Sequence, residues 1–271
     1  MVEKTALVLS AGGMFGAYQA GAWKILAQKF QPGMVIGTSV GALNGWAIAG
    51  GCEPDQLVRY WLDPTAAGFL KPRSRWYPWC SFFDPAEFRA NVQKLSSLFT
   101  PKIPFAVVIT DVLRLRSSLF QSPGVGWQHL AAACAMPVGL PSMRIQGRWY
   151  ADGGLLNVLP LWAAAEMGAS HIVAIHALPQ VPSRIIRSLV KLLRCFSRER
   201  NVAPNLSLTL ISPTTPLGTL TESVLWKRDA VEGFIRKGQE DARNVVMAGA
   251  VKAASERSNT STAVAPKLAA F

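Results

Sequence analysis

The chain has 271 residues, of which half are hydrophobic and 16% are charged, and this composition excludes a mainly disordered protein. Its 28 Lys and Arg residues exceed its 16 Asp and Glu residues, so the formal net charge is +12 at pH 7. Such an excess indicates a polyanionic partner, either a nucleic acid, an anionic membrane or an acidic substrate.

Buried strands and helices alternate along the predicted fold. The continuous apolar runs typical of strands buried on both faces are Thr5–Ser10, Met34–Gly37, Phe105–Asp111, His171–Ala177 and Leu206–Ser212. The helix-like stretches are Phe15–Phe30, Val40–Gly50, Pro54–Leu62, Pro85–Leu98, Trp127–Met136 and Leu159–Met167. Strands separated by helices predict an α/β fold with a mainly parallel sheet.

Three regions define the expected organisation of the chain. Residues 1–254 are predicted to form one domain, and the Ser/Thr/Ala-rich residues 255–271 a disordered tail. Residues 64–83, rich in Pro and aromatic side chains, are interpreted as an excursion from the sheet core.

The start of the chain looks like a strand rather than a signal peptide, and no apolar run reaches the ~18 residues of a membrane span, so we expect a cytoplasmic protein.

The Gly37-Thr38-Ser39-Val40-Gly41 pentapeptide follows a predicted strand and precedes a predicted helix. This context is typical of a nucleophile elbow, in which a strained turn exposes the serine hydroxyl. The hydroxyl would then lie at a helix N-terminus, where the helix dipole favours developing negative charge. The alternative is a tight turn with an incidental serine.

A second glycine-rich stretch, Gly12-Gly13-Met14-Phe15-Gly16, follows the first predicted strand. Glycines leave backbone N–H groups open to an anion, which can be a nucleotide phosphate or the oxyanion of an acyl-transfer intermediate. The acidic residue of a dinucleotide fingerprint and the Walker lysine are both missing, so the oxyanion interpretation is favoured. A turn needed only for close packing stays open.

None of the histidines is a favoured candidate for the base that would activate Ser39. There are three, His129, His171 and His176, and core or strand-end roles are favoured for all of them. The better candidate is Asp152 in the Asp152-Gly153-Gly154 sequence, although Asp followed by two glycines is also a common turn.

The combination of glycine loop, GxSxG and a distal DGG resembles the bacterial-type patatin-like phospholipase family, over roughly residues 5–177. The resemblance implies a three-layer α/β fold, with a mainly parallel central sheet flanked by helices. It also implies a Ser39–Asp152 dyad, an oxyanion hole from Gly12, Gly13 and Met14, elbow glycines Gly37 and Gly41, and acid-loop glycines Gly153 and Gly154. The implied activity is cleavage of ester bonds in phospholipids or lysophospholipids, with no metal and no other cofactor.

Two departures from the family pattern stand in the glycine loop. Ala11 replaces a usual glycine, and Phe15 replaces a usual basic residue. Backbone N–H groups form an oxyanion hole, so neither change must abolish activity. The alternative is a catalytically weak or inactive member that binds lipid.

Much of the positive charge lies in two segments. Residues 183–200 combine Arg184, Arg187, Lys191 and Arg194 with apolar residues at helical spacing, and residues 69–83 mix basic and aromatic side chains. Such patterns favour the surface of an anionic membrane over nucleic acid. We therefore expect a cytoplasmic protein at a membrane surface, with no nucleic-acid partner.

Overall fold

The computed structural model describes residues 4–67, 83–137, 139–179 and 206–249. The tail 255–271, the basic segment 183–200 and nearly all of the 69–83 segment lie outside the described residues.

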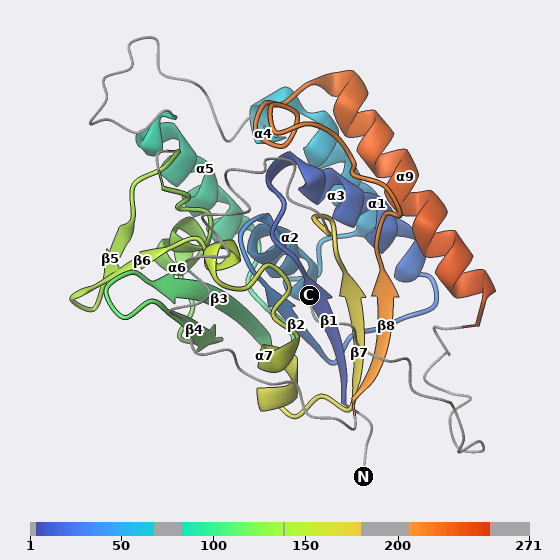
Figure 1. The fold of residues 1–271 in the computed structure, drawn as a ribbon, viewed down its shortest axis with the longest axis horizontal. Helices are drawn as coiled ribbons and strands as arrows, with labels where there is room; N and C mark the ends of the chain where they lie inside the picture. Colours follow the sequence, from blue (N-terminus) through green and yellow to red (C-terminus); the bar gives the residue numbers. More distant parts are fainter. Residues whose placement is uncertain (1–3, 68–82, 138, 180–205, 250–271) are drawn as a thin grey trace.

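One eight-stranded sheet forms the centre of the protein (Figure 1). Its strands are β1 (Thr5–Leu9), β2 (Met34–Gly37), β3 (Phe105–Asp111), β4 (Arg116–Gln121), β5 (Met143–Ile145), β6 (Arg148–Ala151), β7 (His171–Ile175) and β8 (Ser207–Ile211). Their order is β5-β6-β3-β2-β1-β7-β8, with β4 paired to β3. The strands from β3 to β8 in that order are parallel, whereas β4, β5 and β6 pair antiparallel at one edge.

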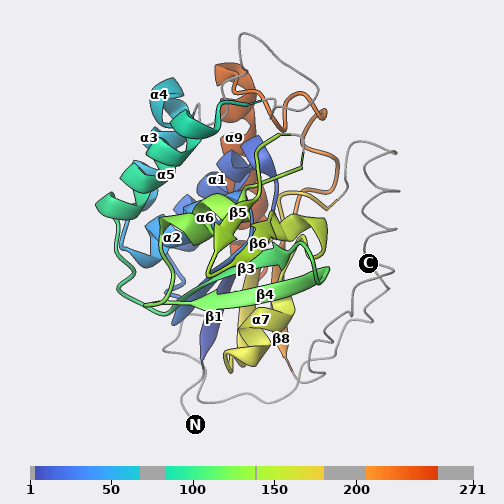
Figure 2. The ribbon, with the colours of Figure 1, turned by 90° about the vertical axis from the view of Figure 1, so that its left-hand side faces the viewer.

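Helices cover both faces of the sheet, so the predicted three-layer α/β architecture is confirmed (Figure 2). The helices are α1 (Gly16–Leu26), α2 (Val40–Ala49), α3 (Pro54–Leu62), α4 (Pro64–Ala67), α5 (Pro85–Leu98), α6 (Trp127–Ala133), α7 (Leu161–Glu166) and α9 (Arg228–Met247). One face packs against α1, α2, α6 and α9 through a large apolar core. The other face packs against α7 through a smaller one that includes Val8, Ile36 and Trp162.

The register of the parallel strands positions the candidate site. Leu9 at the end of β1 pairs with Gly37 at the end of β2 and with Ile175 at the end of β7. Because the strands end level with one another, the glycine loop after β1 and the GxSxG turn after β2 emerge side by side at the carboxyl edge of the sheet, where α/β proteins build their sites.

The long helix α9 packs against α1 (Figure 1), and glycines on both helices allow a close approach. A Cβ on Gly21 would lie 2.1 Å from the Ile235 carbonyl oxygen, and one on Gly238 would lie 2.1 Å from the Tyr18 carbonyl oxygen. At the same crossing the Tyr18 hydroxyl donates to Asp241 Oδ2 at 2.9 Å. Burial and the Asp241 carboxylate raise the pKa of Tyr18, so this hydroxyl keeps its proton and the bond.

All five predicted strands are present, and each predicted helix contains one of the observed helices. The sequence analysis did not predict β4, β5, β6, α4 or α9. No helix in the described ranges is long and apolar enough to cross a membrane.

Candidate active site

Ser39 lies at the sharp turn between β2 and α2. Its φ is +53°, a left-handed value that is uncommon for a residue with a side chain. The turn requires glycine on both sides: a Cβ on Gly37 would lie 2.2 Å from the Gly41 carbonyl oxygen, and one on Gly41 would lie 2.5 Å from the carbonyl oxygens of Leu9 and Ser10. This is the geometry expected of a nucleophile elbow.

Asp152, at the end of β6, lies within hydrogen-bonding distance of Ser39. Ser39 Oγ donates to Asp152 Oδ2 at 2.6 Å, and the other carboxylate oxygen accepts from the Gly154 N–H at 2.7 Å. The carboxylate is therefore oriented by a backbone group on one side and faces the serine on the other. The arrangement provides an acceptor for the serine proton, which a serine nucleophile requires.

The main chain of the acid loop is fixed to β3. Thr110 Oγ1 donates to the Asp152 carbonyl oxygen at 2.9 Å, and Thr38 Oγ1 donates to the Val108 carbonyl oxygen at 3.0 Å. Gly153 lies between these contacts, because a Cβ there would be 2.2 Å from the Val108 carbonyl oxygen and 2.3 Å from Thr38 Oγ1. A residue with a side chain at 153 would therefore push the carboxylate away from Ser39.

Burial controls the proton affinity of Asp152. The residue is 1% exposed, and loss of hydration raises the pKa of its carboxyl group from 3.8 to about 6, although the bonds from Ser39 and Gly154 oppose the rise. A carboxylate with a raised pKa is a stronger base than one in water, and it is still ionised at neutral pH.

Cys134 is a neighbour of Ser39 and Asp152 that the sequence analysis did not identify. It follows α6, is a free thiol, and interacts with both Ser39 and Asp152. Burial, together with the Asp152 charge, holds the pKa of the Cys134 thiol well above its usual value, so the group is neutral. Cys134 therefore places a neutral, weakly polar side chain beside Ser39.

Two backbone amides of the glycine loop are without an acceptor among the described residues. Among the described residues, the N–H groups of Gly12 and Gly13 donate to no acceptor. The N–H of Met14, by contrast, donates to the Ser223 carbonyl oxygen at 2.8 Å. Gly13 has φ +56°, and a Cβ there would lie 2.2 Å from the Ser223 oxygen. Of the three amides expected to bind an oxyanion, the Met14 amide is already bound within the protein.

The two unusual residues of this loop both have packing partners. Phe15 is 1% exposed, and its ring meets the ring of Phe234 on α9 edge-to-face at a centroid distance of 5.1 Å. Ala11 is buried against the acid loop, since a Cβ on Gly154 would be 2.7 Å from the Ala11 Cβ. Phe15 therefore belongs to the core, and Ala11 contacts the loop that carries Asp152.

A chain of buried amide hydrogen bonds joins the glycine loop to α2 and α3. Gln19 Nε2 donates to the Ser10 carbonyl oxygen at 2.7 Å, and Asn44 Nδ2 donates to Gln19 Oε1 and to the Gly16 carbonyl oxygen at 3.0 Å each. Asn44 Oδ1 accepts from Trp61 Nε1 at 3.0 Å. Asn44 thus holds α1, α2 and α3 together directly behind Ser39.

No histidine within the described ranges hydrogen-bonds to Ser39 or Asp152. His129 receives the Gly126 N–H at 3.1 Å, and His171 lies 3.0 Å from Ser207 Oγ. Burial lowers the pKa of His176 to about 4, so it is neutral at physiological pH. In the same ranges, no group of three or more His, Cys, Asp or Glu side chains could hold a metal ion.

Comparison with known proteins matches the chain to one protein family and to individual relatives. The family model described as patatin-like phospholipase matches residues 7–165. Neuropathy target esterase sws of Drosophila melanogaster is 29% identical over 178 residues, which are 62% of this chain and 12% of that protein. Lysophospholipase NTE1 of Mycosarcoma maydis is 27% identical over 178 residues, which are 62% of this chain and 9% of that protein. The chain thus spans about a tenth of the length of these relatives.

Among solved structures, VipD from Legionella pneumophila superimposes with a TM-score of 0.50 and 11% sequence identity, over 92% of this chain and 67% of that chain. At this identity the likeness concerns the fold alone.

Proposed function

The chain belongs to the patatin-like phospholipase family, and on that premise we propose that it is a serine acyl hydrolase of phospholipids or lysophospholipids. The observation that carries the proposal is the 2.6 Å hydrogen bond between Ser39 Oγ and Asp152 Oδ2 at a strained strand-to-helix turn. The name of the matching Mycosarcoma maydis lysophospholipase supports a lipid ester as the substrate class.

In the proposed mechanism Asp152 takes the Ser39 proton as Oγ attacks the ester carbonyl carbon. The carbonyl oxygen becomes an oxyanion, which the N–H groups of Gly12 and Gly13 stabilise, at roughly 3 kcal/mol per donor. When the intermediate collapses, the leaving alcohol receives the proton from Asp152 and Ser39 is acylated. Water then attacks the acyl group, gives its proton to Asp152, and releases the fatty acid with the serine restored.

Met14 has a different role in this proposal. Its N–H already donates to the Ser223 carbonyl oxygen, so it fixes the conformation of the glycine loop rather than contacting the oxyanion. Gly12 and Gly13, whose amides are open among the described residues, supply the donors.

Product analysis tests the proposal directly. Mixed phospholipids and lysophospholipids are incubated with the wild type, with Ser39→Ala and with Asp152→Asn, and released fatty acids are quantified. We expect release by the wild type and its loss in both variants, while Ser170→Ala, an exposed serine before β7, retains full activity. Equal release by Ser39→Ala and the wild type would refute the proposed nucleophile.

The alternative is a lipid-binding protein with weak or no hydrolytic activity. Its motive is Phe15, which stands where the family usually has a basic residue and is buried against Phe234. A fluorophosphonate probe separates the two functions, because it reacts with an activated serine and leaves an unactivated one unlabelled. Labelling that disappears in Ser39→Ala supports the hydrolase.

We also propose that the basic segment with Arg184, Arg187, Lys191 and Arg194, together with residues 69–83, binds an anionic membrane surface. The support is their sequence pattern, since both lie outside the described residues except for Phe83. Sedimentation with vesicles at low salt is the test: equal binding to neutral and anionic vesicles would contradict the electrostatic part.

A further inference from the structure

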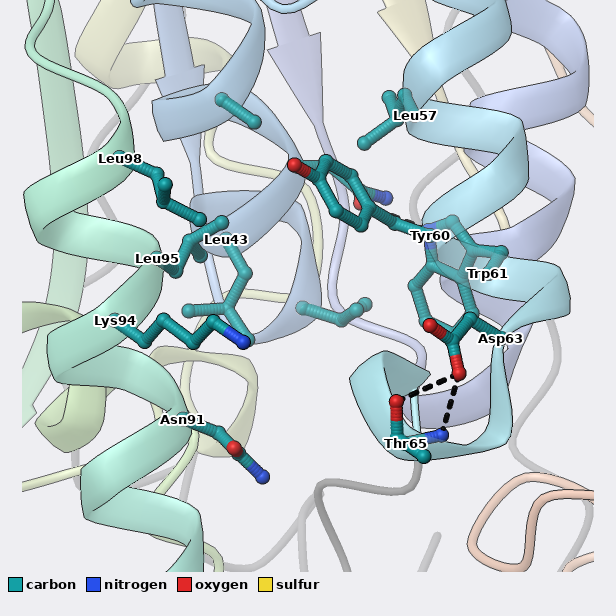
Figure 3. A pocket seen from close by; sticks show the side chains of 13 residues that line it. Leu43, Leu57, Tyr60, Trp61, Asp63, Thr65, Asn91, Lys94, Leu95 and Leu98 are labelled. Atoms are coloured by element: carbon teal, nitrogen blue, oxygen red, sulfur yellow. Dashed lines mark hydrogen bonds between the residues drawn. The ribbon is translucent and has the colours of Figure 1, made fainter.

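A half-open pocket with a volume of about 150 Å³ lies between α2, α3 and α5 (Figure 3). One of its walls is α2, which contributes Val40, Leu43 and Ala47. These positions are spaced three and four residues apart, so they form one face of the helix. Val40 directly follows Ser39, so this wall of the pocket begins one residue after the proposed nucleophile.

The opposite walls come from α3 and α5. Leu57, Tyr60 and Trp61 line the pocket from α3, and Leu95 and Leu98 line it from α5. Figure 3 shows these side chains facing one another across the pocket, with α3 on one side and α5 on the other. A space with such walls favours an unbranched apolar ligand over a polar one.

The two ends of the pocket differ in polarity. The C-terminal ends of α2 and α5 lie together, because Trp46 Nε1 donates to the Phe99 carbonyl oxygen at 2.7 Å. Leu98 therefore lies near the Ala47 end of the pocket, and Asn91, two turns earlier on α5, lies toward the Ser39 end. Figure 3 shows Asn91 and Thr65 at one end, and Leu57 and Leu98 at the other. The polar end therefore lies toward Val40, the residue next to Ser39, and the apolar end lies toward Ala47.

An aromatic pair lies beside the apolar end of the pocket. The rings of Tyr60 and Phe99 meet edge-to-face at a centroid distance of 6.2 Å, and the Tyr60 hydroxyl accepts from Gln56 Nε2 at 3.1 Å. Along α2, the seven residue-to-residue steps from Val40 to Ala47 span about 10 Å. Leu98 is 54% exposed, so it borders the open side of the pocket near this end.

We propose that this pocket binds one fatty acyl chain of the substrate, with the carbonyl group at Ser39 and the methyl end between Leu57, Ala47 and Leu98. The inference rests on the proposed hydrolase function and adds a substrate determinant to it. A chain long enough to reach Leu57 and Leu98 gains apolar contact that a short chain does not, so the pocket favours longer chains over short ones. A chain longer than the pocket leaves through the open side, past Leu98.

The two charged residues of the lining do not oppose an acyl chain. The Asp63 carboxylate accepts hydrogen bonds from the Thr65 N–H and hydroxyl at 2.8 and 2.7 Å, which direct it toward α4. Lys94 is exposed. Its methylene groups can therefore line the pocket while its ammonium group stays in water.

Chain-length profiles test the pocket. Hydrolysis of p-nitrophenyl butyrate and p-nitrophenyl decanoate is compared between the wild type, Leu98→Trp and the matched control Leu210→Trp, an exposed leucine on β8. Each methylene excluded from an apolar site costs about fourfold in binding, so we expect Leu98→Trp to lower kcat/KM for the decanoate about tenfold. The butyrate rate and the control profile stay unchanged. Equal profiles for Leu98→Trp and Leu210→Trp would overturn the proposal.

A binding measurement separates this inference from the proposed function. The fluorescent fatty acid dansylundecanoic acid is titrated into Ser39→Ala with and without Leu98→Trp. About tenfold weaker binding in the double variant supports the pocket even if no ester is hydrolysed, in which case only the hydrolase proposal fails. Unchanged binding, with Ser39-dependent hydrolysis intact, removes the pocket and leaves the hydrolase.

Discussion

Ser39 Oγ and Asp152 Oδ2 are joined by a 2.6 Å hydrogen bond although 113 residues separate them along the chain. The bond connects the N-terminus of α2 with the end of β6. Asp152 is almost completely buried. Burial raises the pKa of this carboxyl group to about 6 even though the hydrogen bond from Ser39 lowers it.

The first prediction concerns the pH dependence of hydrolysis. Asp152 accepts a proton only when ionised, and burial raises its pKa to about 6, so kcat/KM should fall about tenfold per pH unit on the acid side of that value. Initial rates with p-nitrophenyl butyrate across the acid range check this. The extinction coefficient of the released p-nitrophenol is measured at each pH, because its ionisation changes its absorbance. A rate that stays flat down to about pH 4, the ordinary range of a carboxyl group, would contradict the assigned base.

The second prediction concerns the stability of Asp152→Asn. The pKa of Asp152 rises on folding, so the folded protein holds this proton more tightly than the unfolded chain does, and wild-type stability falls as pH rises from about 4 to about 6. Asparagine carries no charge to bury, so at pH 8 the variant should be more stable by up to about 3 kcal/mol, since one pKa unit corresponds to about 1.4 kcal/mol. Urea denaturation at pH 8 and at pH 4 measures it; a gain of equal size at both pH values would argue against the cause.

The third prediction compares a tightly packed glycine with one that has open space around it. Gly153→Ala would bring a Cβ to 2.2 Å from the Val108 carbonyl oxygen, so the loop must move and carry Asp152 away from Ser39. We expect a loss of about 2 kcal/mol in stability and about 100-fold in kcat. Gly233→Ala on α9 meets nothing within 4 Å and should be neutral or stabilising, which makes it the control. Thermal denaturation and initial rates on both variants are needed, and wild-type activity in Gly153→Ala would contradict the packing argument.

The fourth prediction concerns the buried amide chain. Asn44→Ala leaves the Gly16 carbonyl oxygen, the Gln19 side chain and the Trp61 indole without their partner, and unsatisfied buried groups are costly. We expect a loss of about 3 kcal/mol in the free energy of unfolding. The exposed Asn244→Ala on α9 should change stability by less than about 0.5 kcal/mol. Urea denaturation of the two variants in parallel decides, and equal midpoints would mean that the chain is not a structural connection.

The parallel part of the sheet could be predicted because its strands are short apolar runs buried on both faces, as in the fully buried Val107 and Ile109 of β3. The antiparallel edge could not. β4 is half-exposed along most of its length and carries Arg116 and Gln121 at its ends, and β5 has only three residues. β4 is held by pairing with β3, and β5 by pairing with β6, rather than by any pattern of their own.

Helix α9 was missed although its buried residues Val231, Phe234, Ile235, Gly238 and Ala242 follow helical spacing, which an explicit count of periodicity would have found. The candidate site shows the opposite limit. Glycine-based motifs indicated Ser39 and Asp152, but Cys134, Thr110 and Ser223 come from segments with no motif. Only folding brings Cys134 and Thr110 to Ser39 and Asp152, and Ser223 to the glycine loop.

The Phe15–Phe234 ring contact determines how much of the chain must be kept when the site is moved into another protein. The family match ends at residue 165, whereas Phe234 and the Ser223 carbonyl oxygen that holds the glycine loop lie far beyond it. A fragment cut at the match boundary would carry both dyad residues yet leave a large aromatic side chain exposed and the loop unsupported. Transplanting the Ser39–Asp152 site into another protein therefore requires the chain through α9.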